Sequence, residues 1–374
     1  MMKTLLCFFT LILFESSYAL KLTTYNTGLA HGYVPLASKR INPILNSLKQ
    51  HDSDVLCLQE VWEKNDRYLF HDVLKETYPH WFFTKIKNTK TQRAPSCKVN
   101  NLFGKDKFVT CLLKNCSNLP SDESTSCLMN KCQHSLIKLK KDNKDCANAL
   151  MAKVGQSPVK AIFTLLNPLW AQGLFAYGGS DGLMVFSKYP IIKKEVVDFS
   201  KIATLNRRRA LKVTIEKDQK EHAVLCTHLT ANLEGEAPYT GDFKNWEEEN
   251  KEQLSILLND KELLKESRPT YILGDLNCGF SNPTIPLEDA MVNSCNQILE
   301  SDFFNPFYES PVGCTFCPDN SLLSPTASPI AIDHILTRNV MIREKRRVFD
   351  ELIFIDDKPQ NLSDHYGLQI ETQE

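Results

Sequence analysis

Polar side chains that can do chemistry recur where apolar segments of the sequence end. They are Asn26, Glu60, His228, Asp275, Asn277, Asp333, Asp364 and His365. Singly, each has an ordinary structural explanation, because Asp and Asn are good turn formers and a lone histidine is more often a hydrogen-bonded structural residue. As a set, they lie where rigid elements deliver side chains into a shared cleft. We therefore expect them to converge in one pocket.

The residue types in this set suit one kind of chemistry. Carboxylate and amide oxygens suit Mg²⁺ or another hard divalent ion, such as Mn²⁺, better than zinc. His228 and His365 can transfer protons or donate a hydrogen bond to a phosphoryl oxygen, and Asp333 or Asp364 can orient and charge an imidazole. This combination of residues fits phosphoester hydrolysis, in which a metal neutralises the non-bridging oxygens and an oriented base deprotonates water.

Alternating and continuous apolar runs predict the strands that position these residues. We expect an α/β protein with strands at residues 20–26, 54–62, 182–191, 208–216, 222–230, 270–277, 331–337 and 363–371. Apolar residues at helical spacing predict a helix at 38–51, and a second, charged helix is expected from about 245 to 264. No repeat and no long linker divides the chain, so we expect one catalytic domain over residues 20–374.

The composition and the first residues bear on where the protein works. With 42% hydrophobic and 24% charged residues, the 374-residue chain has the profile of a soluble globular protein, and its formal net charge of -1 provides no global field for polyanions. Residues 1–19 combine Lys3, a mainly apolar stretch and a small-x-small end at Ala19, which is typical of a secretory signal peptide. We expect a secreted protein, extracellular or periplasmic.

The cysteines support export. Thirteen are present, one of them in the expected leader, and an oxidising compartment favours disulfides over metal ligation. Six lie from Cys97 to Cys146 in a Lys-, Asn- and Ser-rich segment, which predicts a disulfide-stapled insertion at about 95–150 with open connectivity. The Cys-Thr-Phe-Cys segment at 314–317 lies in a Pro/Ser-rich loop, so we expect structural pairing there, with Cys278 or Cys295, rather than a redox site.

Seven segments of the chain, in order, resemble the metal-dependent endonuclease/exonuclease/phosphatase superfamily, which includes deoxyribonuclease I and the neutral sphingomyelinases. They are TTYN, LQEVW, GSDGLMVFSKYPI, CTHLTAN, ILGDLN, IDHIL and LSDHYGL. Each segment alone is weak evidence, but their shared order is specific, and the resemblance spans residues 20–371 apart from the cysteine-rich insertion. It implies a deoxyribonuclease I-like, four-layer α/β/β/α sandwich with two sheets face to face and helices outside.

The resemblance also implies roles around a metal. Glu60 would bind the catalytic Mg²⁺, with Asn26 close by. Asp275 would orient the nucleophile or contact the metal, and Asn277 would bind the transition state.

For proton transfer, the resemblance implies a histidine pair. His365 would be the general base that activates water, with Asp364 or Asp333 supporting the pair. His228 would hydrogen-bond the phosphate or protonate the leaving oxygen.

The substrate is expected to be a phospholipid headgroup on a membrane surface, with sphingomyelin favoured. Trp62 after Glu60-Val61, the GSDG segment and the THLTA segment resemble the sphingomyelinase branch. The GDLNCG segment suits a nuclease equally well, and NRRRALKV lacks the Lys-Gly pair associated with many sphingomyelinases. A secreted nuclease acting on nucleic acid is therefore the alternative, and a catalytically inactive binding module is a third hypothesis. We expect a monomer.

Two further segments bear on this choice. The apolar stretch at 161–177 is interpreted as a core helix with a loop under the insertion, the alternative being an exposed aromatic surface that enters a bilayer. The basic segments at 85–93 and Arg207–Arg209 could contact nucleic-acid phosphates, but we interpret them as solvated basic faces.

Overall fold

The computed structural model describes residues 19–86, 97–116, 121–153, 158–166, 175–235, 237–264 and 267–373. Nearly all of the expected signal peptide, most of the basic segment at 85–93 and the middle of the apolar stretch, 167–174, lie outside the described residues. Within these ranges, no helix is both long and apolar enough to cross a membrane.

Two β-sheets form the centre of the molecule. The first contains, in order across the sheet, β10 (Ile342–Val348), β13 (Gly367–Thr372), β1 (Lys21–Asn26), β2 (Val55–Gln59), β4 (Met184–Ser187) and β3 (His80–Phe82). The second contains β5 (Ile191–Asp198), β6 (Arg209–Lys217), β7 (Lys220–His228), β8 (Thr270–Asp275) and β9 (Asp333–Arg338). A separate hairpin is formed by β11 (Leu352–Ile355) and β12 (Lys358–Asn361).

The alternation of side chains along each strand assigns the two faces of both sheets. In β2, Val55 and Cys57 point into the core between the sheets, whereas Leu56 and Leu58 pack on the outer face. Strands of the second sheet alternate in the same way: Tyr271 and Leu273 of β8 meet the first sheet. Central strands such as β2 and β8 are therefore covered on both faces, which explains their nearly continuous apolar sequences, whereas the edge strands β5 and β10 are charged and largely exposed.

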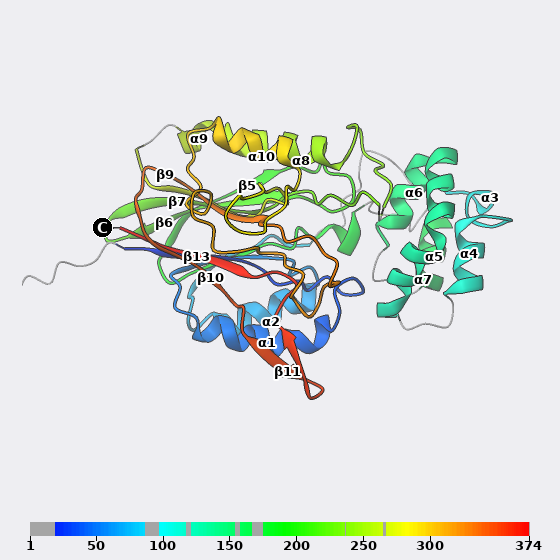
Figure 1. The fold of residues 1–374 in the computed structure, drawn as a ribbon, viewed down its shortest axis with the longest axis horizontal. Helices are drawn as coiled ribbons and strands as arrows, with labels where there is room; N and C mark the ends of the chain where they lie inside the picture. Colours follow the sequence, from blue (N-terminus) through cyan, green and yellow to red (C-terminus); the bar gives the residue numbers. More distant parts are fainter. Residues whose placement is uncertain are drawn as a thin grey trace, which may run out of the picture.

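Helices cover the outer faces (Figure 1). On the first sheet lie α1 (Ala37–Gln50) and α2 (Lys64–Leu74), and on the second lie α8 (Trp246–Leu258), α9 (Lys261–Leu264) and α10 (Val292–Leu299). The four-layer α/β/β/α sandwich expected from the sequence is thus confirmed.

Two predicted elements are divided in the structure. Residues 182–191 are not one strand: β4 ends at Ser187, and after Tyr189-Pro190 the chain enters the second sheet as β5, so this segment connects the sheets. The charged helix predicted at 245–264 stops at Leu258, and Asp260 accepts backbone hydrogen bonds that begin α9.

The chain between β3 and β4 forms a helical lobe beside the sandwich (Figure 1). It contains α3 (Val99–Leu102), α4 (Phe108–Asn115), α5 (Ser121–Asp142), α6 (Lys144–Met151) and α7 (Pro158–Leu166). Its six cysteines pair with one another in nested order, as Cys97–Cys146, Cys111–Cys132 and Cys116–Cys127. In α7, Ala161 and Leu165 are buried and Phe163 is 58% exposed, so the first part of the apolar stretch is an amphipathic helix of this lobe, whereas its end, Phe175 and Ala176, is buried in the sandwich beside the cavity.

The other disulfides lie in the sandwich. Cys57–Cys226 joins β2 to β7 across the central core. The expected pairing of the 314–317 cysteines with Cys278 or Cys295 is wrong: Cys314 bonds to Cys317, and Cys278 bonds to Cys295. The spacing of these four cysteines in the sequence does not distinguish the possible pairings. The structure decides, because the loop after β8 brings Cys278 against Cys295 of α10.

Candidate active site

The predicted site residues meet at one edge of the sandwich. The parallel pairing of β7 and β8 places His228 beside Asp275, and the antiparallel pairing of β8 and β9 places Asp275 beside Asp333. A cavity of about 430 Å³ opens there. Six of the eight predicted residues line it: Glu60, His228, Asp275, Asn277, Asp364 and His365. The other two, Asn26 and Asp333, are buried directly behind this lining.

Asp275 is at the centre of the cluster. Its Oδ2 accepts a hydrogen bond from Asn26 Nδ2 at 3.0 Å and lies 3.4 Å from His228 Nε2 and 3.9 Å from His365 Nε2. Its Oδ1 accepts from the backbone N–H of Asn277 at 2.9 Å. Burial, followed by the charge of Asp333, raises the pKa of Asp275 to about 7.

His365 is oriented by Asp333. Its Nδ1 donates to Asp333 Oδ2 at 2.8 Å, which leaves Nε2 directed toward Asp275. Burial opposes protonation of this histidine, but the charge of Asp333 and the hydrogen bond to it, together with Asp275 and Asp364, hold its pKa well above the usual value. Of the two aspartates considered as partners for the histidines, Asp333 is the one that bonds His365, whereas Asp364 contacts the hydroxyl of Ser363.

His228 is in the opposite electrostatic state. Burial, and then the nearby charges of Arg208 and His365, keep its pKa well below the ordinary value, so its imidazole is neutral. Its Nδ1 has no hydrogen-bond partner among the described residues. A buried imidazole nitrogen without a partner is costly unless a ligand completes it.

Glu60 faces the same cavity with its backbone in the left-handed region, at φ 61°. A non-glycine residue there costs about 1–3 kcal/mol, and such strain is often stored at functional positions. The N–H of the next residue, Val61, donates to the carbonyl of Gly182, which holds the turn in place. Burial and the charge of Asp364 raise the pKa of the Glu60 carboxyl to about 7.

The carboxylates fit a divalent cation. Glu60 and Asp275 are destabilised as anions by burial and by neighbouring carboxylates, and their pKa values rise to about 7. Asp275, Asp333 and His365 also present ligand atoms within 4.8 Å of one another. An oxygen-rich, negatively charged donor set of this kind suits a hard cation.

Asn277 also has a left-handed backbone, at φ 55°. Its Nδ2 donates to the carbonyl of Leu229 at 3.0 Å, so its amide side chain connects the segments that follow β8 and β7. The side chain is partly exposed in the cavity.

Sequence reasoning missed Arg40, which holds two of the active-site loops. This guanidinium on α1 is fully buried and donates to four backbone carbonyls, those of Thr27, Gly28, Pro35 and Leu362. It thereby ties the segment after Asn26 to the segment before Asp364. No signal in the sequence pattern could have revealed it, because arginine on a surface helix is usually exposed.

Two glycines near the site have packing reasons. Gly182, in the GSDG segment, has φ +70°, and a Cβ there would lie 2.8 Å from a ring carbon of Trp62. Gly28 has φ +56°, and its Cβ would overlap Asp364 Oδ1. Glycine is therefore required at both positions, because it lets Trp62 and Asp364 pack against the backbone.

The basic segment Arg207–Arg209 is not a solvated face, so that interpretation was wrong. Arg207 and Arg209 both pair with Asp198 at 2.8 Å. Arg208 is 4% exposed, lines the cavity and lies over the ring of Trp62 at 5.7 Å. Its Nη1 has no hydrogen-bond partner among the described residues, and burial lowers its pKa to about 10, so it remains a cation. A buried cation of this kind is suited to bind an anion in the cavity.

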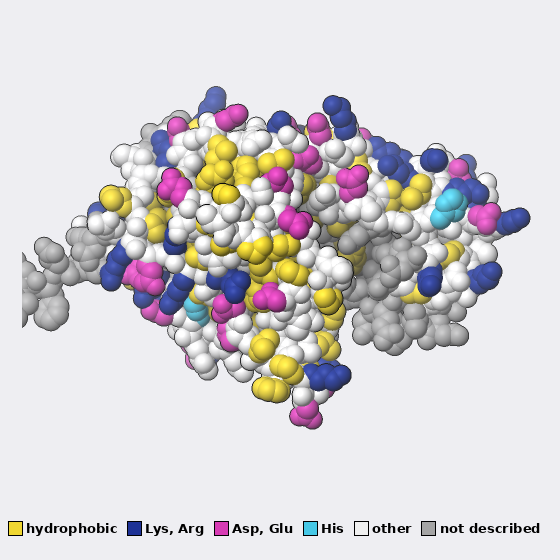
Figure 2. Space-filling view, viewed as in Figure 1, with side chains coloured by type: hydrophobic (Ala, Val, Ile, Leu, Met, Phe, Trp, Pro, Cys, Tyr) yellow, Lys and Arg dark blue, Asp and Glu magenta, His cyan; other side chains and the backbone are white. Residues whose placement is uncertain are grey.

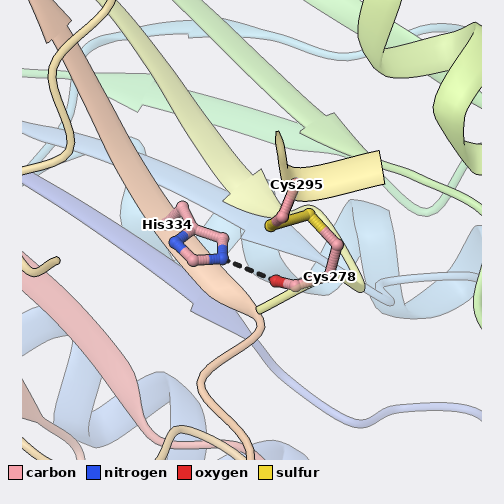
Figure 3. A group of neighbouring side chains, drawn as sticks. All are labelled: Cys278, Cys295 and His334. Carbon is pink, nitrogen blue, oxygen red and sulfur yellow. Dashed lines mark hydrogen bonds between the residues drawn. A yellow bond between two sulfur atoms is a disulfide. The ribbon is translucent and has the colours of Figure 1, made fainter. Parts of the chain in front are cut away.

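A second group of metal-ligand residue types lies on the far side of β9 (Figure 3). Cys278, Cys295 and His334 are close together, but the two sulfurs form a disulfide with each other, and His334 Nε2 donates to the carbonyl of Cys278 at 2.7 Å. Disulfide sulfurs are not thiolate ligands, so this cluster is structural. It fixes the loop that follows Asn277 against the strand that carries Asp333.

Comparison with known proteins agrees with this arrangement. The sequence pattern of the endonuclease/exonuclease/phosphatase family matches residues 23–365. No curated protein sequence matches the chain. Solved structures with a similar fold include sphingomyelinase C from Streptomyces griseocarneus, at 15% identity over 95% of this chain and 99% of that chain, with a TM-score of 0.52. Beta toxin from Staphylococcus aureus (15%, 94% and 99%, 0.54) and truncated TDP2 from Caenorhabditis elegans (11%, 96% and 98%, 0.54) are similar in fold as well.

Proposed function

Because the chain belongs to the endonuclease/exonuclease/phosphatase family, we propose that it is a secreted, Mg²⁺-dependent phosphodiesterase that hydrolyses a phospholipid headgroup ester, with sphingomyelin as the leading substrate. One observation carries the proposal of phosphodiester hydrolysis. Three carboxylates, two histidines and an amide from distant parts of the chain line one cavity, and Asp275 Oδ2 lies within 4 Å of both imidazoles. The same oxygen ligands would also suit Mn²⁺ in place of Mg²⁺.

The metal is proposed to bind Glu60, with Asp275 and Asn26 as further ligands or close neighbours. When bound, a divalent cation supplies Lewis-acid stabilisation of the phosphate charge and lowers the pKa of coordinated water. Magnesium is the leading candidate because the donor set is all oxygen, and because the fold relative beta toxin has been solved with bound magnesium ions.

The two histidines are proposed to divide the proton transfers. Asp333 fixes the ring of His365 through Nδ1, so that Nε2 is available to accept a proton from the attacking water once the neighbouring carboxylates are neutralised. His228, neutral and buried, donates a hydrogen bond from a ring nitrogen to the phosphate or its leaving oxygen. Arg208 holds a non-bridging oxygen, and Asn277 contributes its partly exposed amide.

Three observations support a lipid over a nucleic acid. One of the fold relatives is named as sphingomyelinase C. The Arg207 and Arg209 side chains are paired with acids rather than presented to a polyanion. The β11–β12 hairpin projects from the molecule and carries exposed apolar residues (Figures 1 and 2): Phe354 is 77% exposed and Leu352 is 57% exposed. Such residues suit contact with a membrane surface.

Secretion is part of the proposal. The twelve cysteines after residue 19 all form disulfides, which persist in oxidising compartments. The leader-like sequence at residues 1–19 is consistent with export.

The test is a side-by-side hydrolysis assay of the purified mature protein with Mg²⁺, with and without EDTA. Vesicles of sphingomyelin, vesicles of other phospholipids, and plasmid DNA are the substrates. We expect phosphocholine release from sphingomyelin that EDTA abolishes. Nicking of DNA without phosphocholine release would reject the lipid assignment in favour of the nuclease, and no hydrolysis of any phosphodiester would reject the catalytic proposal.

Replacement of Arg208 with methionine is expected to lower kcat/KM by about 10²–10³-fold, the cost of removing one preorganised donor to a developing oxyanion. Methionine keeps an unbranched side chain at this position but removes the buried cation and its contact with the Trp62 ring. Arg207→Met is the matched control, because its guanidinium is directed to Asp198 outside the cavity, and it should retain activity near that of wild type. Equal losses in both variants, at equal melting temperatures, would contradict a phosphate-binding role for Arg208.

A further inference from the structure

The cavity is larger than a phosphate group requires. One of its walls is formed by five apolar side chains of the segment between β8 and β9: Phe316, Leu322, Leu323, Ile330 and Ile332. The total volume of about 430 Å³ is in the range of pockets that enclose whole small ligands, about 300–1,000 Å³. A site for a phosphodiester group alone would not require an apolar wall of this extent.

This apolar wall directly adjoins the reacting centre. The ring of Phe316 packs edge-on against the imidazole of His365, with ring centroids 5.2 Å apart. Phe316 also forms backbone bridges with both Ile330 and His365. A group bonded to a phosphate beside His365 would therefore have this apolar wall within contact distance.

The apolar wall is preformed. Asn320 Nδ2 donates to the carbonyl of Ser363 at 2.8 Å, and the N–H of Ser321 donates to Asn361 Oδ1 at 2.9 Å. The Cys314–Cys317 disulfide closes the turn that presents Phe316. Because these contacts already order the segment, a ligand that packs on it does not have to bear the cost of ordering a loop.

We propose that this apolar wall binds the hydrocarbon chain of the substrate's own alcohol, so that the chain enters the cavity next to His365 instead of remaining wholly in a lipid surface. The inference rests on the proposed phosphodiesterase function and narrows its substrate to amphiphiles, in which a phosphodiester is joined to an alkyl or acyl-bearing alcohol. It assigns Leu323 and Ile330, both partly exposed, a role in substrate specificity.

The experiment uses alkyl phosphocholines with chains of increasing length, all below their critical micelle concentrations, so that no lipid surface is present. With the full mature protein and Mg²⁺, kcat/KM is expected to rise by up to about fourfold per methylene and then to level off when the chain outgrows the cavity. A flat dependence on chain length, with hydrolysis of p-nitrophenyl phosphocholine retained, would overturn this inference and leave the proposed function intact. Failure to hydrolyse p-nitrophenyl phosphocholine as well would defeat both.

Two variants locate the effect. Leu323→Ser is expected to lower kcat/KM for the longest monomeric substrate by about fivefold to tenfold, in line with partial loss of a leucine contact, and to affect p-nitrophenyl phosphocholine, whose leaving group carries no alkyl chain, less strongly. Leu299→Ser is the control, because Leu299 is 55% exposed at the end of α10 and does not line the cavity. Equal effects of both substitutions would overturn the assignment, as would a Leu323→Ser variant that loses DNA nicking instead, since that would assign the wall to a nucleobase.

Binding without turnover gives an independent measurement. In EDTA, calorimetric titration of the wild-type protein with the same alkyl phosphocholines is expected to show affinity that increases with chain length and a negative heat-capacity change, the mark of apolar burial. Loss of that increase in Leu323→Ser, with an unchanged melting temperature, supports the inference. The same affinity for all chain lengths in the wild-type protein would overturn it.

Discussion

Alanine in place of His365 is expected to lower kcat/KM for a phosphodiester by about 10²–10⁴-fold, the usual contribution of a positioned general acid or base. The physical reason is that Asp333 fixes this ring 2.8 Å away and aims its Nε2 at the carboxylate cluster. Steady-state hydrolysis of p-nitrophenyl phosphocholine measures the loss, and circular dichroism checks that the fold is retained.

A matched control for this substitution is His222→Ala. His222 is buried to a similar degree but lies near the start of β7, at the opposite end of that strand from His228. Its replacement should lower stability without a comparable loss of kcat. Asp333→Asn should reduce activity in the same direction as His365→Ala, because it preserves shape and removes the charge that holds the imidazole. A loss of less than tenfold for His365→Ala would show that the proton is transferred elsewhere.

Removal of divalent cations with EDTA is the second large effect, and it should abolish hydrolysis until Mg²⁺ is restored. Glu60→Gln is expected to lower kcat/KM by about 10²–10⁴-fold even in excess Mg²⁺, since Lewis-acid stabilisation is worth several kcal/mol and about 1.36 kcal/mol corresponds to tenfold. The substitution removes the carboxylate whose pKa is raised to about 7 by burial and by Asp364.

Thermal unfolding tests the metal site without relying on catalysis. A cation that binds only the folded protein stabilises it by about 2.7 kcal/mol at one hundred times its Kd, so the melting temperature of the wild-type protein should rise with added Mg²⁺. Glu60→Gln should largely lose this rise. Glu63→Gln, three residues further on and exposed at the start of α2, should retain it. The same increase in all three proteins would place the metal away from Glu60.

Much of the secondary structure could be predicted from the sequence, because helix and strand patterns depend on neighbouring residues. The apolar spacing of Ile41, Ile44, Leu45 and Leu48 predicted α1, and these four residues are buried on the first sheet. Where local signals mislead, the tertiary structure overrides them. Residues 182–191 form a continuous apolar-rich segment, but Tyr189 and Pro190 lie at a crossing between sheets, and nothing in a linear pattern marks a change of sheet.

The environments of two arginines differ from what the sequence pattern predicts. Arg208 stands between two arginines and was interpreted as part of a solvated face, but alternation of side chains at the start of β6 directs its side chain into the cavity while its neighbours pair with Asp198. Arg40 is buried because four carbonyls from separate loops surround it. Neither environment can be recognised from neighbours in sequence, because the groups that create it come from distant segments.

The sequence alone determined which side chains could act on a phosphoester, and the strand ends on which they lie, because side-chain chemistry and strand periodicity are local properties. The tertiary structure decided which of them touch: that Asp333 rather than Asp364 bonds His365, that Cys314 pairs with Cys317, and that an apolar wall stands beside the histidine. These outcomes depend on distances between segments separated by tens to hundreds of residues, and such distances are set by sheet register and packing.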